Sequence, residues 1–96
     1  MPQVPVNVTH EADQRRFVTY VEHQLCQACY DQMNGTMHLT HTGVPAALEG
    51  QGIAAALVAA ALAHARSQGW QVRPVCSYVR AYMQRHPETQ DLLEIR

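Results

Sequence analysis

The chain has 96 residues, 47% of them apolar and 16% charged, and these totals indicate one globular domain over residues 1–96 rather than a disordered segment. The formal net charge of -1 excludes the strong field that gathers nucleic acid or anionic membranes. The longest apolar run, Ile53 to Ala63, is too short to span a bilayer. Three cysteines, an odd number, and an N-terminus without a basic or apolar leader lead us to expect reduced thiols in a cytoplasmic protein.

The first half of the chain is predicted to form an antiparallel meander. Its strand-like runs are Val4–Thr9, Arg15–Glu22, Gln24–Asp31 and Thr36–Val44, the second of them rich in β-branched and aromatic residues. Asn34-Gly35 lies between the last two runs and is the sharpest hairpin-turn signal in the chain. We expect a β-bulge near Gly43, where the last run ends.

The second half is predicted to consist of two helices separated by one strand. Gly50 to Gln68 is rich in alanine, with a broad apolar face, and Gly69 stands where a left-handed residue would end a helix. The following elements are a strand at Trp70–Val75, a helix at Ser77–His86, and a final helical turn from Pro87 through Leu93. A strand, a helix and a further strand in succession favour a right-handed crossover with parallel pairing. The expected fold is therefore α+β, an antiparallel meander, helix, parallel strand and helix on one mixed sheet.

A Gly-x-Gly-x-Ala sequence, Gly50 to Ala54, opens the first predicted helix. The first amides of a helix have no partner within it, and the helix dipole makes that end partly positive. Small residues let a phosphate approach this bare backbone without help from Lys or Arg. Two glycines at a helix start are more often capping and turn residues, and the segment lacks both the P-loop lysine and the third glycine of the dinucleotide fingerprint. From the residues alone, an anion site and a simple cap both stay open.

This sequence belongs to a longer series of motifs at characteristic spacings. The full series is His41-Thr42-Gly43-Val44-Pro45, Leu48-Glu49-Gly50-Gln51-Gly52-Ile53-Ala54, Pro74-Val75-Cys76, Tyr82, His86-Pro87-Glu88 and Asp91-Leu92-Leu93. In order and spacing, from Arg16 onward, the chain resembles the short YjdJ-type branch of the GNAT (GCN5-related) N-acetyltransferases. The resemblance implies a minimal GNAT fold whose sheet splays apart beside the strand after the helix, and it implies acetyl-CoA as the cosubstrate.

The resemblance also implies which residues bind the coenzyme. Glu49, Gly50, Gln51, Gly52, Ile53 and Ala54 would form the pyrophosphate loop, and the strand end with Thr42 and Val44 would offer backbone groups to the pantetheine arm. Glu49 departs from the general GNAT pattern, which opens this loop with Gln or Arg, so one cation fewer lies near the phosphates. Pro74 cannot donate to a β-ladder, so strand pairing should fail close to Val75 and open the slot.

Three further residues are candidates for the chemistry. Cys76 precedes a helix, whose positive end lowers the pKa of a thiol, and it could take the acetyl group, protonate the departing CoA thiolate or pack as a small buried residue. His41 has the parity of Met37 and Leu39, and is either a general base for an ammonium acceptor or a core histidine. Tyr82 either lines the thioester end of the slot or packs its ring in the core.

The spacing His23-x-x-Cys26-x-x-Cys29 is that of a possible metal or redox motif. A strand sends positions three apart to opposite faces, whereas a Cys-x-x-Cys metal site needs both sulfurs on one side. No second cysteine pair follows downstream. We therefore expect no metal site, and zinc or dithiol chemistry stays open only as a third function.

Two candidate functions of different classes agree best with the sequence. The first is acetyl-CoA-dependent N-acetylation of an unidentified primary amine on a protein or small molecule. The second is an acetyl-CoA-binding interaction module without turnover. We expect neither nucleic acid nor a membrane as a partner, and a homodimer could form if a second copy covers the edge of the last strand.

Overall fold

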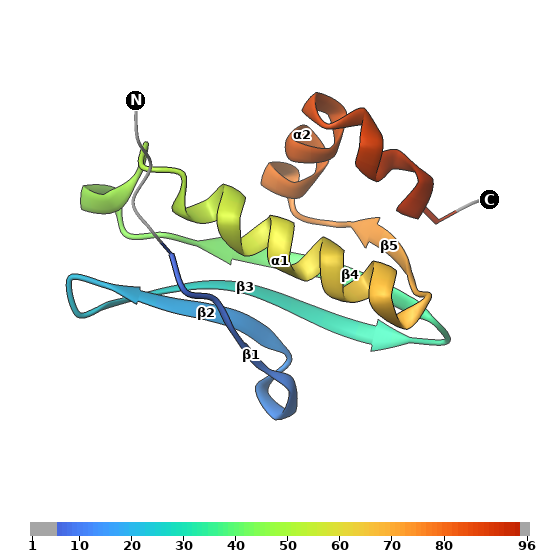
Figure 1. The fold of residues 1–96 in the computed structure, drawn as a ribbon, viewed down its shortest axis with the longest axis horizontal. Helices are drawn as coiled ribbons and strands as arrows, with labels where there is room; N and C mark the ends of the chain where they lie inside the picture. The colour runs from blue at the N-terminus through green and yellow to red at the C-terminus, as the bar shows by residue number, and fades with distance from the viewer. Residues whose placement is uncertain (1–5, 95–96) are drawn as a thin grey trace.

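A five-stranded mixed sheet organises residues 6–94, the part of the chain that the computed structural model describes (Figure 1). The strands lie in the sheet in chain order: β1 Thr9–Glu11, β2 Arg16–Val21, β3 Gln24–Met33, β4 Thr36–Gly43 and β5 Gln71–Pro74. The first four pair antiparallel, and β5 pairs parallel to β4. The helices are α1 Ile53–Gln68 and α2 Ser77–Arg85, with short 3-10 helices η1 Ala12–Gln14, η2 Ala46–Leu48 and η3 Pro87–Leu92. The predicted α+β order of meander, helix, parallel strand and helix is confirmed.

The hydrophobic core lies between α1 and the sheet. Leu57 and Val58 of α1 are fully buried, as are Met37 and Leu39 of β4. Burying an aliphatic side chain of this size contributes about 1.5–3 kcal/mol each. Ala61 is also fully buried and belongs to the same cluster, and its small side chain lets the helix backbone lie close to the strands.

Replacing Ala61 by a larger residue tests how closely α1 packs on the sheet. We expect Ala61→Leu to lower the free energy of unfolding by about 1–3 kcal/mol, because a closely packed core has no room for the added carbons. Ala59 lies on the exposed side of the same helix, so Ala59→Leu should change stability by less than about 0.5 kcal/mol. Urea unfolding followed by circular dichroism would measure both variants. Equal midpoints for the two variants would show that α1 is more loosely seated than described.

The turn and helix-end signals in the sequence mark real boundaries. Asn34 and Gly35, with φ of 53° and 79°, form the two-residue turn between β3 and β4, as a primed hairpin turn requires. Gly69 ends α1 in the left-handed region at φ 72°, and its N–H donates to the carbonyls of Ala65 and Arg66. The start of α1 was predicted at Gly50, but the helix begins at Ile53 because Gly50 and Gly52 have φ of 84° and 81°.

The first strand differs from its prediction. A strand was expected over Val4–Thr9, of which residues 4 and 5 lie outside the described part of the chain. Residues 6–8 form no strand, and the first strand is Thr9–Glu11, paired with Arg16–Val18. Val6 and Val8 are nevertheless partly buried and pack against the core cluster.

A β-bulge in β4 changes which side chains face α1. Tyr30 of β3 pairs with Leu39, but Cys29 pairs with His41, so Thr40 is an extra residue on β4. The bulge was predicted near Gly43 and therefore lies three residues earlier. An extra residue reverses the alternation of side chains beyond it. Thr42, opposite the buried Ala28, consequently faces α1, and His41 faces the other side of the sheet.

The sheet opens at the end of β4. Pairing between β4 and β5 ends at Leu39 with Pro74, and the last bond across the gap runs from the N–H of Cys76 to the carbonyl of Leu39. Residues 40–43 of β4 therefore have no partner on the β5 side, which confirms the predicted failure of pairing near Val75. The outer edge of β5 was the surface expected to receive a second copy. Leu93 bridges to Val72 there, and the N–H of Glu94 donates to the carbonyl of Val72, so the chain itself covers part of that edge.

Candidate active site

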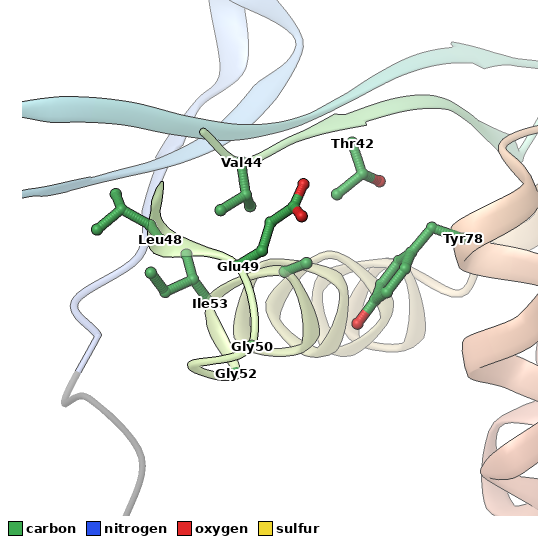
Figure 2. A pocket seen from close by; sticks show the side chains of 9 residues that line it. Thr42, Val44, Leu48, Glu49, Gly50, Gly52, Ile53 and Tyr78 are labelled. Atoms are coloured by element: carbon green, nitrogen blue, oxygen red, sulfur yellow. The ribbon is translucent and has the colours of Figure 1, made fainter. Parts of the chain in front are cut away.

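A pocket of about 410 Å³ lies between the N-terminus of α1 and the open end of β4. Figure 2 shows that one wall comes from the loop before α1 and the other from β4 and α2. The lining residues are Thr42, Val44, Leu48, Glu49, Gly50, Gly52, Ile53, Ala54 and Tyr78. The pocket thus joins the two segments that the sequence assigned to the coenzyme.

The loop before α1 presents bare backbone to this pocket. Gly50 and Gly52 hold it in the left-handed region, where a residue with a side chain is strained. Gly52 is the N-cap of α1, and no side chain of the described residues caps the helix there. A Cβ at Gly50 would meet nothing within 4 Å, so the space beside this glycine is open. The first amides of α1 are therefore available to an anion, and the dipole of the 16-residue helix favours negative charge at this end.

The end of β4 forms the opposite wall because of the bulge. Thr42 is turned toward α1, and Val44 follows on the same side of the pocket. No strand pairs with residues 40–43 on the β5 side, so apart from the contact of Thr42 with Cys76 this edge is open to an extended ligand. The geometry suits a long, narrow molecule with an anionic group at the α1 end.

Cys76 lies beside this wall, as the N-cap residue of α2. Its Sγ is 3.6 Å from the Oγ1 of Thr42, and its side chain is partly exposed. Burial by itself raises the pKa of the thiol, but hydrogen bonds to the thiolate from the backbone of Val79 and Tyr78 and from Thr42 outweigh that effect. The net pKa is lower than that of an ordinary cysteine. Cys76 is thus the one cysteine of the described residues whose pKa falls, since burial raises the pKa of both Cys26 and Cys29.

The structure brings most of the predicted coenzyme residues together. Thr42, Val44, Glu49, Gly50, Gly52, Ile53 and Ala54 all line the pocket. Gln51 lies in the same loop without lining it. Ile53 is 1% exposed and anchors the start of α1 in the core.

Tyr82 does not lie at the pocket. It is buried, stacks on His86 at a ring-centroid distance of 4.0 Å, and lines a separate small cavity with the middle of α1. Tyr78, one helical turn nearer the start of α2, lines the pocket instead. The sequence did not point to Tyr78 because Tyr78 and Tyr82 are four residues apart and lie on the same face of the helix, so helical periodicity does not distinguish them. Proximity to the helix N-terminus was the available signal, since the first turn of α2 adjoins the open sheet.

His41 is separated from the pocket by the sheet. The side chain is exposed and lies over Gly43, where a Cβ would come within 3.0 Å of the imidazole Nε2. The core-histidine interpretation of His41 is therefore wrong, because the bulge at Thr40 cancels the parity that it shared with Met37 and Leu39. His41 belongs to the unpaired stretch of β4, and its side chain lies on the face that α1 does not cover.

The cysteines of the Cys-x-x-Cys motif lie on opposite faces of β3. Cys26 is fully buried in the core under α1, whereas Cys29 pairs with His41 on the other face. Among residues 6–94, no three His, Cys, Asp or Glu side chains gather closely enough to hold a metal ion. Within the same range, no helix has the length and apolar character needed to cross a membrane.

Comparison with known proteins agrees with the fold. Residues 16–92 match the family model of the GCN5-related N-acetyl-transferases. The solution NMR structure of "a GCN5-like putative N-acetyltransferase" from Staphylococcus aureus is similar, with a TM-score of 0.72 over 98% of this chain and 91% of that chain, at 23% identity. At that identity the likeness shows a shared fold, and no curated protein sequence matches the chain. Because the family model spans most of its length, the chain belongs to the GCN5-related N-acetyltransferases, and acetyl transfer to nitrogen is the class of activity that this family assigns to it.

Proposed function

We propose that the protein transfers the acetyl group of acetyl-CoA to a primary amine. The observation that supports this most is the uncapped start of α1, where amides without partners face the open pocket. Those amides would hold the diphosphate of the coenzyme, with Gly50 and Gly52 allowing its close approach. The lining residues in the described part of the chain include no cationic side chain, so backbone amides supply the attraction in this proposal.

The pantetheine arm would run along the free edge of β4 toward Cys76. In that pose Thr42 and Val44 flank the arm, and the thioester lies near the 3.6 Å contact between Cys76 and Thr42. Backbone amides close to the carbonyl would stabilise the negative charge that develops on its oxygen. The fold then contributes mainly by positioning, since two substrates held in contact react far faster than in solution.

Cys76 can serve the reaction by two routes. In the first, its thiolate attacks the acetyl carbonyl, the carbon–sulfur bond to CoA breaks, and CoA leaves as a thiolate. The amine then attacks acetyl-Cys76 and returns the thiolate. In the second, the amine attacks the thioester directly and the Cys76 thiol gives its proton to the departing CoA thiolate. The lowered pKa of Cys76 favours the first route, because it raises the fraction of thiolate.

His41 fits the proposal as a general base on the far side of the opened sheet. It belongs to the stretch of β4 that has no β5 partner, and its side chain lies on the face away from α1. An amine that reaches the thioester from that face would pass His41 and could lose its ammonium proton there. The two substrates would then meet in the opening, the coenzyme from the α1 side and the amine from the other.

Thermal unfolding with and without acetyl-CoA, followed by an assay of CoA release with a panel of amines, tests the proposal. At a concentration of about 100 times the dissociation constant, acetyl-CoA should stabilise the protein by about 2.7 kcal/mol. Release of CoA should then depend on the amine. Stabilisation without release across a broad panel would instead support a binding module without turnover. No stabilisation at any concentration would contradict coenzyme binding itself.

A further inference from the structure

Among residues 6–94, those that line the pocket include a single carboxylate and no basic group. Of these described residues Glu49 alone has an acidic side chain, and the others are apolar, glycine, threonine or tyrosine. None of the ion pairs formed within residues 6–94 includes Glu49. The pocket therefore presents an uncompensated negative charge, although the ligand proposed for it is itself anionic.

The position of this carboxylate separates it from the diphosphate end. In Figure 2 the side chain of Glu49 points away from Gly50 and Gly52 and toward β4, into the space between Val44 and Thr42. Thr42 is the residue in contact with Cys76. The negative charge of Glu49 thus faces the part of the pocket nearest the reactive thiol, where the acyl end of the coenzyme would lie.

We propose that Glu49 determines the class of acyl group, admitting uncharged short acyl-CoA thioesters and rejecting those whose acyl chain ends in a carboxylate, such as malonyl-CoA and succinyl-CoA. The inference rests on the proposed function, since it requires a CoA thioester in this pocket. All acyl-CoA molecules carry the same phosphates, so any repulsion of the phosphates by Glu49 cancels when two of them are compared. What remains is the interaction of Glu49 with the acyl group.

The repulsion between the Glu49 carboxylate and a carboxylate on the acyl group depends on how much water lies around them. Glu49 is exposed in the structure, and a bound thioester would displace water from its side of this mostly apolar pocket, so two carboxylates facing each other there would repel more strongly than in free solution. Discrimination of this kind uses a repulsive contact against the wrong ligand and needs no additional contact with the right one. A basic residue at position 49 would aid phosphate binding. The glutamate that stands there instead would select between charged and uncharged acyl groups.

Dissociation constants of malonyl-CoA and butyryl-CoA, measured by isothermal titration calorimetry, test the proposal. The two acyl groups have similar length and differ in charge. In the native protein we expect malonyl-CoA to bind at least about tenfold more weakly than butyryl-CoA. In the Glu49→Gln variant the two constants should come within about threefold of each other, because the charge is removed and the shape kept.

A matched control variant is available, and the two possible negative results have different meanings. Glu22→Gln removes the same charge from the exposed turn between β2 and β3, and it should keep the native ratio of the two constants. A native ratio near one, or an unchanged ratio in Glu49→Gln, would overturn the role of Glu49 while leaving the proposed function intact. Failure of acetyl-CoA and butyryl-CoA alike to bind the native protein would overturn the proposed function as well.

Discussion

Replacing Gly50 by Asp is expected to weaken acetyl-CoA binding at least about 100-fold, which is about 2.7 kcal/mol. The glycine lies at φ 84° beside open space at the mouth of the pocket. Asp tolerates this left-handed conformation better than most residues, so the fold should survive. Its carboxylate would compete with the diphosphate for the first amides of α1 and repel it as well. Titration calorimetry with acetyl-CoA measures the loss.

Two further variants isolate the charge from the strain. Gly50→Asn has nearly the same shape without the charge, so it should weaken binding about tenfold at most. Gly35→Asp places the same residue at φ 79° in the β3–β4 turn, also with nothing within 4 Å of its Cβ, and should bind like the native protein. If Gly50→Asp binds acetyl-CoA as tightly as Gly35→Asp does, the amides at the start of α1 do not hold the diphosphate.

Replacing Cys76 by Ala is expected to reduce amine-dependent CoA release by roughly 10²–10⁴-fold, the range typical for the loss of a group that transfers a proton or forms a covalent intermediate. Acetyl-CoA binding should change little, because the coenzyme is held mainly at α1 and β4 in the proposed pose. Cys76→Ser keeps a hydroxyl that is a poorer nucleophile and acid than the thiol, so its rate should also fall. Single-turnover kinetics of the three proteins gives the comparison.

Mass spectrometry separates the two routes through Cys76. If the thiolate takes the acetyl group, incubation with acetyl-CoA in the absence of amine should leave one acetyl group on Cys76 and none on the Cys76→Ala variant. If the thiol only protonates CoA, both proteins stay unmodified while the rate loss remains. Full activity in both variants would remove Cys76 from the mechanism. The chain has no lysine, so no side-chain amine competes for the acetyl group.

The elements that the sequence predicted well are those with a local chemical cause. Asn34-Gly35 gives a primed turn because both residues tolerate positive φ, and Gly69 ends α1 for the same reason. The alanine-rich helix and the parallel crossover follow from propensity and from the order of the elements. The residues alone left the role of the loop at Gly50 and Gly52 open, and the family resemblance assigned it to the coenzyme; in the structure this loop lines the pocket.

The parts that the sequence did not predict depend on tertiary context. Nothing in the run around Thr40 marks a bulge, because the extra residue is defined by its pairing with β3. That one residue reverses His41 and Thr42, and so decides which of them faces the coenzyme pocket. The choice between Tyr78 and Tyr82 depends in the same way on the position of α2 relative to α1, which helical spacing does not specify.

Coenzyme binding at the start of α1 is tested most directly by following the backbone amides during titration with acetyl-CoA. In two-dimensional NMR spectra of the ¹⁵N-labelled protein, the amides of Gly50, Gly52, Ile53 and Ala54 should show the largest shifts at saturation. CoA without the acetyl group should shift the same amides, because it carries the same diphosphate. Saturation of the protein with these four amides unmoved, and shifts clustered elsewhere, would contradict the claim that the start of α1 holds the coenzyme.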